Sequence, residues 1–169
     1  MALKNKNTRL LRQSVDSGGQ VKPVSEFRQD PVSGDWVLLA PLRSGRHKFK
    51  RRAKMELSKN KCPFENPSKF GNAPPVLVYQ KETKNDWFLQ IISNKYPAVG
   101  QGDCGLIYQK SLYKIQAGVG FHEIVIFRDH NRHLADFTKE EIKKVLLAYQ
   151  ERYRSLAKEK CVEYISIFH

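Results

Sequence analysis

The sequence predicts an α+β fold, in which one long helix covers an antiparallel β-sheet. Short apolar runs rich in β-branched and aromatic residues, each bounded by turn residues, dominate the chain up to Phe127. After them comes a single segment, from Ile142 to Leu156, in which apolar residues recur at helical spacing. A helix with one apolar face packed on an antiparallel sheet gives the α+β class.

The first predicted strand follows a turn. Asp30-Pro31 and Ser33-Gly34 are dipeptides with strong turn chemistry, and the β-rich run 35–40 comes directly after them. Pro41 ends this run, because proline has no backbone N–H to donate to a neighbouring strand. We therefore predict a turn that leads into a buried strand.

Further strands are predicted where apolar runs lie between clusters of polar or turn-forming residues. These runs are 76–79, 87–92, 106–113, 122–127 and the closing strand 162–168, in which apolar and polar residues alternate. The segments 43–61 and 62–67 are predicted to be loops, because the first has no sustained period and the second is rich in proline.

The long helix has a start signal in the sequence. Thr138 is followed three residues later by Glu141, which forms a capping box, and Phe137 can pack on Ile142 as a hydrophobic staple. Together these features contribute on the order of 1 kcal/mol to the start of the helix. The apolar residues that follow predict one helix face packed on the sheet, with the charged residues turned away.

The length and the apolar content of the chain indicate how many domains it forms. The chain has 169 residues, 40% of them apolar, which is enough for one domain with a single core. Residues 1–22 are polar and basic, so we predict a flexible basic tail followed by one domain over 23–169.

No apolar run approaches the roughly 20 residues of a membrane span, and the basic start lacks the apolar segment of a secretory signal. We therefore predict a cytoplasmic protein with no membrane partner.

The chain is strongly basic, with a formal net charge of +13 and a pI near 9.8. Such a charge attracts polyanions, whether nucleic acid, anionic lipid or a phosphorylated metabolite. The stretch 43–61 contains nine Lys or Arg residues and a single acidic one, Glu56. This stretch is the first candidate for contact with an anion.

Four segments of the sequence resemble a known family. They are the run 28–41 (RQDPVSGDWVLLAP), Cys62-Pro63-Phe64-Glu65, Asn94-Lys95-Tyr96-Pro97-Ala98 and the run 122–130, a strand that ends in a histidine. In order and spacing they resemble the amino-terminal half of galactose-1-phosphate uridylyltransferases, which are members of the histidine-triad (HIT) superfamily. The resemblance covers roughly 25–169 and implies that the sheet is a HIT-like half barrel.

The resemblance implies a nucleotidyltransferase of galactose metabolism that moves UMP between UDP-glucose and galactose 1-phosphate. In this family a histidine attacks the α-phosphorus, holds the uridylyl group covalently and passes it to a second sugar phosphate, which is nucleophilic catalysis. That histidine belongs to a His-Pro-His-x-Gln motif, which does not occur in these 169 residues. We therefore expect the domain to be truncated before the catalytic histidine and the chain alone to be inactive. We do not assign the nucleophile role to His169.

Five residues are implied in substrate binding. Arg43 and Arg46 match two arginines that contact phosphate, Asn94 suits a uracil edge or a ribose because its amide both donates and accepts, and Phe64 or Tyr96 can pack against the base. Without the resemblance, a solvated basic loop is the favoured interpretation of the two arginines, and the structural alternative for Asn94 is a turn before Pro97. The resemblance also implies a UDP-sugar and a hexose 1-phosphate as partners, and a homodimer in the full-length protein.

Zinc is the metal that the resemblance implies. Cys62 matches the first cysteine of the family's Cys-x-x-Cys, Glu65 stands in place of the second, and His130 matches a zinc histidine. Zinc accepts carboxylate oxygen, so these residues supply three ligands, and the fourth would come from the histidine motif named above. The competing interpretation is a buried thiol at Cys62 and a turn histidine at His130. The metal site is therefore expected to be incomplete in this chain.

Two other functions remain open from the sequence. A non-catalytic, basic nucleic-acid-binding module is favoured by the charge and by aromatic residues interleaved with Lys and Arg. No motif for a base-stacking platform supports it, so nucleic acid is not the partner that we predict. An adenylyl transferase or phosphorylase of the same fold would differ in the base that it binds.

Overall fold

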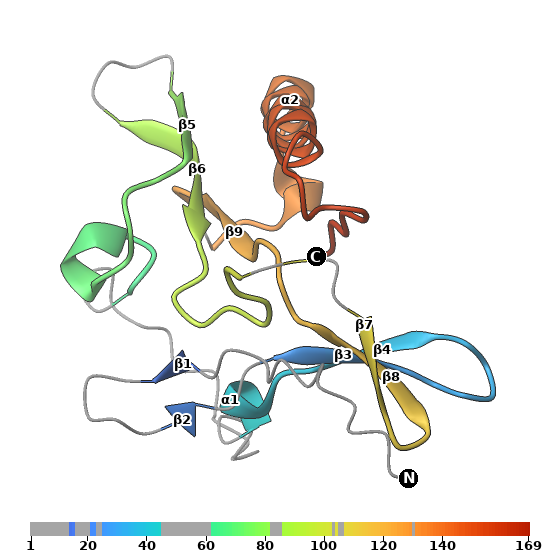
Figure 1. The fold of residues 1–169 in the computed structure, drawn as a ribbon. Coiled ribbons are helices and arrows are strands. Elements are labelled where there is room, and N and C mark those ends of the chain that lie inside the picture. The colour runs from blue at the N-terminus through green and yellow to red at the C-terminus, as the bar shows by residue number, and fades with distance from the viewer. Residues whose placement is uncertain are drawn as a thin grey trace, which may run out of the picture. The chain divides into compact units, whose positions relative to one another are not determined.

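The computed structural model describes residues 14–15, 21–22, 25–44, 62–81, 86–102, 104, 107–129 and 131–169. The chain divides into two compact units, a first unit of Met1–Lys48 and Ala98–Val119 and a second unit of Phe49–Pro97 and Gly120–His169. The α+β class is confirmed, since the described strands pair in antiparallel sheets and one long helix follows them (Figure 1). The strands are divided among separate sheets, where the sequence suggested one.

The first unit contains a four-stranded antiparallel sheet in the order β4-β3-β8-β7. Its strands are β3 (Glu26–Gln29), β4 (Trp36–Leu39), β7 (Ile107–Lys110) and β8 (Tyr113–Ala117). A short helix α1 (Pro41–Ser44) follows β4, and β1 (Ser14–Val15) pairs separately with β2 (Val21–Lys22). The strand predicted at 35–40 is confirmed as β4, but it is not buried as predicted, since Trp36 is 40% exposed and Val37 is 52% exposed. Strand β3 was not predicted.

The turn between β3 and β4 forms as the sequence predicts. The Asp30 carboxylate accepts hydrogen bonds from the backbone N–H of Val32 at 2.7 Å and of Ser33 at 3.0 Å. Gly34 has a φ of 80°, in the left-handed region that glycine enters without a steric penalty. These bonds explain why a turn sits at this point, and they hold the pKa of Asp30 below its ordinary value.

The run 106–113 was predicted as one strand, but its described part contains β7, a turn and the first residue of β8. Strands β7 and β8 pair antiparallel on either side of Ser111 and Leu112. Ser111 adopts a φ of 57°, and its carbonyl accepts a hydrogen bond from the side chain of Gln109 at 2.9 Å. The single-strand prediction is wrong because the left-handed turn position carries serine rather than the glycine or asparagine that usually marks such turns.

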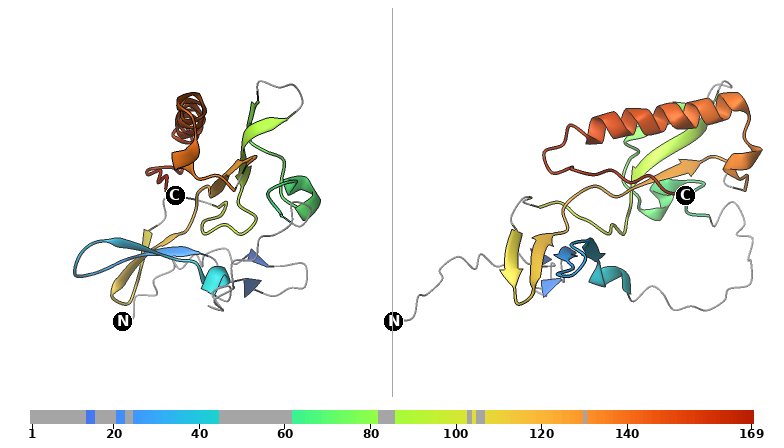
Figure 2. Two further views of the ribbon diagram at one scale, coloured as in Figure 1. Left: turned by 180° about the vertical axis from the view of Figure 1, so that it is seen from behind. Right: turned by 90° about the vertical axis from the view of Figure 1, so that its right-hand side faces the viewer.

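The second unit is a three-stranded antiparallel sheet, β5-β6-β9, with the long helix α2 packed on it (Figures 1 and 2). The strands are β5 (Leu77–Gln80), β6 (Trp87–Ser93) and β9 (Glu123–Phe127), and the helix is α2 (Lys139–Leu156). Two short 3₁₀ helices, η2 (Pro67–Phe70) and η3 (Leu134–Asp136), lie in the connections. Strands were predicted at 76–79, 87–92 and 122–127, and these three predictions are confirmed within one residue at each end.

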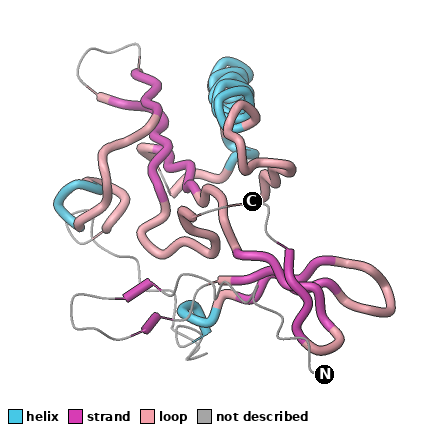
Figure 3. The backbone as a smooth tube through the Cα atoms, viewed as in Figure 1, coloured by secondary structure: helices cyan, strands magenta, loops and turns pink. Residues whose placement is uncertain are grey.

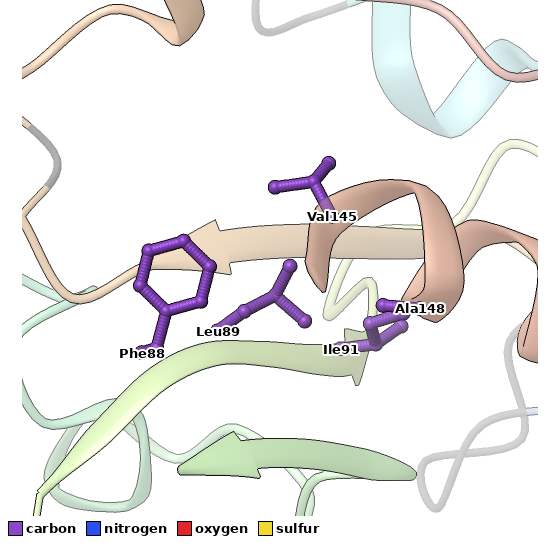
Figure 4. Packing of buried hydrophobic residues seen from close by; sticks show 5 residues of the cluster. All are labelled: Phe88, Leu89, Ile91, Val145 and Ala148. Atoms are coloured by element: carbon purple, nitrogen blue, oxygen red, sulfur yellow. The ribbon is translucent and has the colours of Figure 1, made fainter. Parts of the chain in front are cut away.

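The core of the second unit lies between β6 and α2. Leu89 and Ile91 share one face of β6 and meet Val145 and Ala148 on the buried face of the helix (Figure 4). Phe88 and Ile92, which alternate with them along the strand, are buried as well. The ring of Phe137 lies 5.0 Å from that of Phe127, centroid to centroid, in an edge-to-face arrangement. This contact fixes the entry of the chain into α2 against the sheet.

The predicted capping box at the start of α2 is confirmed. The Thr138 hydroxyl accepts from the Glu141 backbone N–H at 3.3 Å, and the Glu141 carboxylate accepts from the Thr138 backbone N–H at 2.8 Å. The same carboxylate forms a bidentate pair with the Arg132 guanidinium, both bonds being 2.9 Å long. Arg132, and after it the Thr138 backbone, lowers the pKa of Glu141 from 4.5 to about 2.

This pKa shift predicts a pH dependence of stability. Because the folded pKa of Glu141 lies below the unfolded one, its contribution is complete above about pH 4.5 and is lost as the pH falls towards 2. Glu141→Gln is therefore expected to lower the unfolding free energy by about 1 kcal/mol at pH 7 and by much less at pH 2.5. Thermal unfolding across this pH range measures the difference. Glu140→Gln, an exposed acid in the same helical turn, is the matched control, and a Glu141→Gln effect that stays constant with pH would contradict the assignment.

The segment 162–168, predicted as a closing strand, forms no strand. After α2 the chain turns over 157–161, and the residues that follow have no regular structure (Figure 3). Tyr164 is 84% exposed and Phe168 is 81% exposed. The prediction is wrong because alternation specifies which face a strand would bury, whereas forming the strand requires a neighbouring edge to pair with.

Among the helices that the structure describes, none has the length and apolar character needed to cross a membrane.

Candidate functional site

Most of the described candidate residues lie on two loops of the second unit. The first loop carries Cys62, Phe64 and Glu65 and continues into η2, and the second follows β6 and carries Asn94 and Tyr96. The two loops are joined, because the Lys95 ammonium donates a hydrogen bond to the carbonyl of Phe70 at 3.0 Å. The fold therefore brings together residues that are about 30 positions apart in the sequence.

Asn94 is held by three hydrogen bonds at the end of β6. Its backbone N–H donates to the His122 carbonyl at 2.8 Å, just before β9 begins. Its side-chain oxygen accepts from the backbone N–H of Tyr96 at 2.9 Å, and its side-chain nitrogen lies 3.0 Å from Nε2 of His122. The Asn94 amide is thus fixed on both sides before any ligand binds.

This arrangement determines the orientation of the amide and the tautomer of the imidazole. The Tyr96 backbone N–H can only donate, so the atom facing it must be the Asn94 oxygen. The Asn94 amide nitrogen therefore faces His122 and donates, and Nε2 of His122 must be unprotonated to accept. Among the bonds that the structure describes, one N–H of the Asn94 amide and one lone pair of its oxygen are not used.

Two aromatic side chains on these loops present surface to solvent. Tyr96 is 49% exposed and Phe64 is 37% exposed. The Lys95 ammonium lies 5.9 Å from the centre of the Tyr96 ring, within the range of a cation–π contact. Rings with open faces beside amide groups are what packing against a nucleobase requires.

Of the two predicted phosphate-binding arginines, the structure describes one. Arg43 lies in α1 of the first unit, is half-buried, and donates its backbone N–H to the carbonyl of Ala40 at 3.0 Å. Arg46 lies outside the described residues, as does the predicted zinc histidine His130.

One turn carries the two candidate metal ligands that the structure describes, Cys62 and Glu65. The Glu65 backbone N–H donates to the Cys62 carbonyl at 3.2 Å, and the Cys62 side chain is buried. The Glu65 carboxylate, however, binds the Arg128 guanidinium at 2.6 Å. A guanidinium at this distance opposes a divalent cation on the same oxygen, so Glu65 does not fit the role of a zinc ligand in this arrangement. Among the described residues, no group of three or more His, Cys, Asp or Glu side chains is placed to hold a metal ion.

Sequence reasoning missed two residues that organise these loops. His122 begins the matched run 122–130 but received no role of its own, and its hydrogen bond to Asn94 makes it the support of the second loop. Arg128 was not singled out, although it binds the first loop. The available signal for both was position, since they flank β9 at its start and at its end.

Three similarities to known proteins are found. The chain is 29% identical over 149 residues to an ADP-glucose phosphorylase of Arabidopsis thaliana, covering 85% of this chain and 42% of that protein. It is 23% identical over 145 residues to a galactose-1-phosphate uridylyltransferase of Thermotoga maritima, covering 85% of this chain and 40% of that protein. A solved structure described as "Structure of uridylyltransferase" matches with a TM-score of 0.52 and 27% identity, over 82% of this chain and 37% of that one.

This chain spans about two fifths of the length of these relatives. The sequence profile of the family described as "Galactose-1-phosphate uridyl transferase, N-terminal domain" matches residues 19–169. That match includes both loops described above and nearly all of the described structure. The chain therefore belongs to the family of galactose-1-phosphate uridyl transferase N-terminal domains.

Proposed function

We propose that this chain forms part of the nucleotide site of a nucleotidyltransferase that transfers UMP between UDP-glucose and galactose 1-phosphate. Family membership supports the reaction class. The observation that carries the proposal is the Asn94 amide, which His122 and the Tyr96 backbone hold with a donor and an acceptor still open. The activity of a whole protein is inferred here from a chain that spans two fifths of its relatives.

The chemistry of the Asn94 amide matches the edge of a nucleobase. Uracil presents an N–H donor beside carbonyl acceptors, so one amide can pair with it through two bonds. Because the amide is already oriented, little rotational freedom is lost when the base binds. The exposed rings of Tyr96 and Phe64 are the candidates for packing against the base.

Cations are the second requirement of the proposed reaction. In phosphoryl transfer, fixed positive groups stabilise charge on the phosphate oxygens as the bond to the leaving group breaks. Arg43 and Arg46 are proposed for this role, and the net charge of +13 attracts an anionic sugar nucleotide to the protein. The uridylyl-histidine intermediate forms on a nucleophile that we assign to no residue of this chain. The homodimer, in which subunits complete each other's sites, and the cytoplasmic location are also parts of the proposal that follow from the resemblance.

We propose fewer zinc ligands in this chain than the three that the resemblance implies. Cys62 and His130 are the residues that we propose as zinc ligands if this protein binds zinc. Glu65 is left out, because its carboxylate is held by Arg128.

A specific observation favours a second candidate function, adenylyl transfer. The higher identity, 29%, is to the ADP-glucose phosphorylase. The Asn94 amide does not discriminate between these readings, since adenine also presents a donor beside an acceptor. The reaction class is the same, and the base is what differs.

Calorimetric titration of the protein with UDP-glucose and with ADP-glucose tests the proposal. We expect UDP-glucose to bind about ten-fold more tightly, a difference of about 1.4 kcal/mol. The reverse order supports the adenylyl candidate. If neither ligand binds, while single-stranded nucleic acid binds with an affinity that falls steeply as salt rises, the nucleic-acid alternative replaces both.

A further inference from the structure

Arg128 joins the Cys62–Glu65 turn to the sheet. We propose that a cluster of Glu65, Asp86, Trp87 and Arg128, here called the Arg128 cluster, fastens this turn in place of a metal ion, and that Glu65 is a structural anion rather than a metal ligand. The proposal concerns how the loop is held, and it does not depend on which nucleotide the protein binds.

Arg128 makes contacts through its backbone N–H, its Nε, its Nη1 and the face of its guanidinium. Directly after β9, its backbone N–H donates to the carbonyl of Phe88 at 2.9 Å. Its Nη1 donates to the Glu65 carboxylate at 2.6 Å and to the Glu65 backbone carbonyl at 2.8 Å. One nitrogen therefore binds both the side chain and the backbone of the turn. Its Nε lies 3.0 Å from the Asp86 carboxylate, and its guanidinium carbon lies 5.3 Å from the centre of the Trp87 ring.

Together with Lys81, the Arg128 cluster is balanced in charge. Asp86 also pairs with the Lys81 ammonium at 3.0 Å, so two carboxylates face two cations. Lys81 is the largest of the causes that hold the pKa of Asp86 below its ordinary value, and it acts together with Arg128. The Glu65 side chain is only 16% exposed and that of Arg128 30%, so water screens this pair less than a surface pair.

The cluster links three segments that are distant in sequence. It joins the turn at 62–65 to the start of β6 and to the end of β9. A zinc ion held by a Cys-x-x-Cys turn and a histidine near the end of the strand would make the same kind of connection. Glu65 stands where the Cys-x-x-Cys pattern has its second cysteine. This replacement allows the ion pair with Arg128, because a carboxylate can form charge-assisted bonds with a guanidinium and a thiol cannot.

Metal binding at Glu65 would compete with these bonds. Zinc binds a carboxylate oxygen at about 2.0 to 2.2 Å, which would bring a divalent cation close to the guanidinium on the same carboxylate. The two cations would repel each other in a partly buried site. A metal ion on the Glu65 carboxylate would therefore weaken the bond that Arg128 makes to this side chain.

The test combines metal dependence with a double-mutant cycle. Thermal unfolding of the protein is followed after dialysis against EDTA and after addition of zinc chloride, and bound zinc is measured by mass spectrometry. We expect the midpoint to differ by less than about 1 °C between the two conditions. Arg128→Met and Glu65→Gln are each expected to lower it by roughly 3–8 °C, and the double variant by little more than either alone. Arg154→Met, which removes an exposed arginine of α2, is the matched control.

Two results would overturn the proposal. The first is stoichiometric zinc in the protein, with a midpoint that falls on EDTA treatment and with zinc lost in Glu65→Gln, which would make Glu65 a ligand. The second is strict additivity of the two substitutions, which would mean that Arg128 and Glu65 do not act through each other. If Arg128→Met does not fold, the nearly isosteric Glu65→Gln still gives both the EDTA comparison and the zinc content.

Discussion

Replacing Leu89 with alanine is expected to lower the free energy of unfolding by about 2–5 kcal/mol. Leu89 is fully buried in the middle of β6 and belongs to the cluster that joins the sheet to α2. The substitution removes apolar contact area and leaves a cavity. Because β6 is bonded to β5 on one side and β9 on the other, the backbone around Leu89 has little freedom to move into that cavity.

Urea unfolding measures this effect, and a leucine of the same unit supplies the control. Leu146 lies on α2 but is 59% exposed, so Leu146→Ala removes the same atoms from a site that is already exposed to solvent. We expect Leu146→Ala to change the unfolding free energy by less than about 1 kcal/mol. Equal losses for the two variants would contradict the placement of the core between β6 and α2.

Local signals explain most of what the sequence predicts correctly. The start of α2 was predictable because Thr138 and Glu141 interact within one turn, and their bonds form as expected. Strands β6 and β9 were predictable because long apolar runs identify strands buried in a core. The turn at Asp30 follows from the chemistry of its own residues.

Contacts between distant residues account for what the sequence did not predict. Glu65 and Arg128 are 63 positions apart, and nothing in either local pattern indicates that they meet. The segment 162–168 has the alternation of a strand, but pairing depends on an edge that the pattern does not supply. The division of the strands into separate sheets is likewise a property of which edges meet.

The candidate site was predicted only in part. Family motifs indicated Asn94, Tyr96, Phe64, Cys62 and Glu65, and the structure places them on two joined loops. The motifs did not reveal that Asn94 depends on His122, because the two residues lie 28 positions apart on neighbouring strands. A motif identifies the residue that contacts a ligand more readily than the residue that orients it.

Asn94→Ala is expected to weaken binding of the sugar nucleotide by about 10- to 100-fold, because it removes both bonds that the amide is proposed to make to the base. The substitution also removes the acceptor for the Tyr96 backbone N–H, which would loosen the loop. Calorimetric titration with UDP-glucose measures the change. Asn131→Ala, at an exposed asparagine of the same unit, is the control and should leave the affinity unchanged.

Asn94→Asp separates the role of the donor from that of the turn. Aspartate still accepts from the Tyr96 backbone N–H, and its second oxygen can accept from His122 when the imidazole proton lies on Nε2, so the loop is retained. It offers no N–H to the base. We therefore expect its thermal midpoint to stay near that of the unsubstituted protein while its affinity for UDP-glucose falls about as far as that of Asn94→Ala. If Asn94→Asp binds UDP-glucose normally, the amide N–H does not contact the ligand, and Asn94 serves only to shape the turn before Pro97.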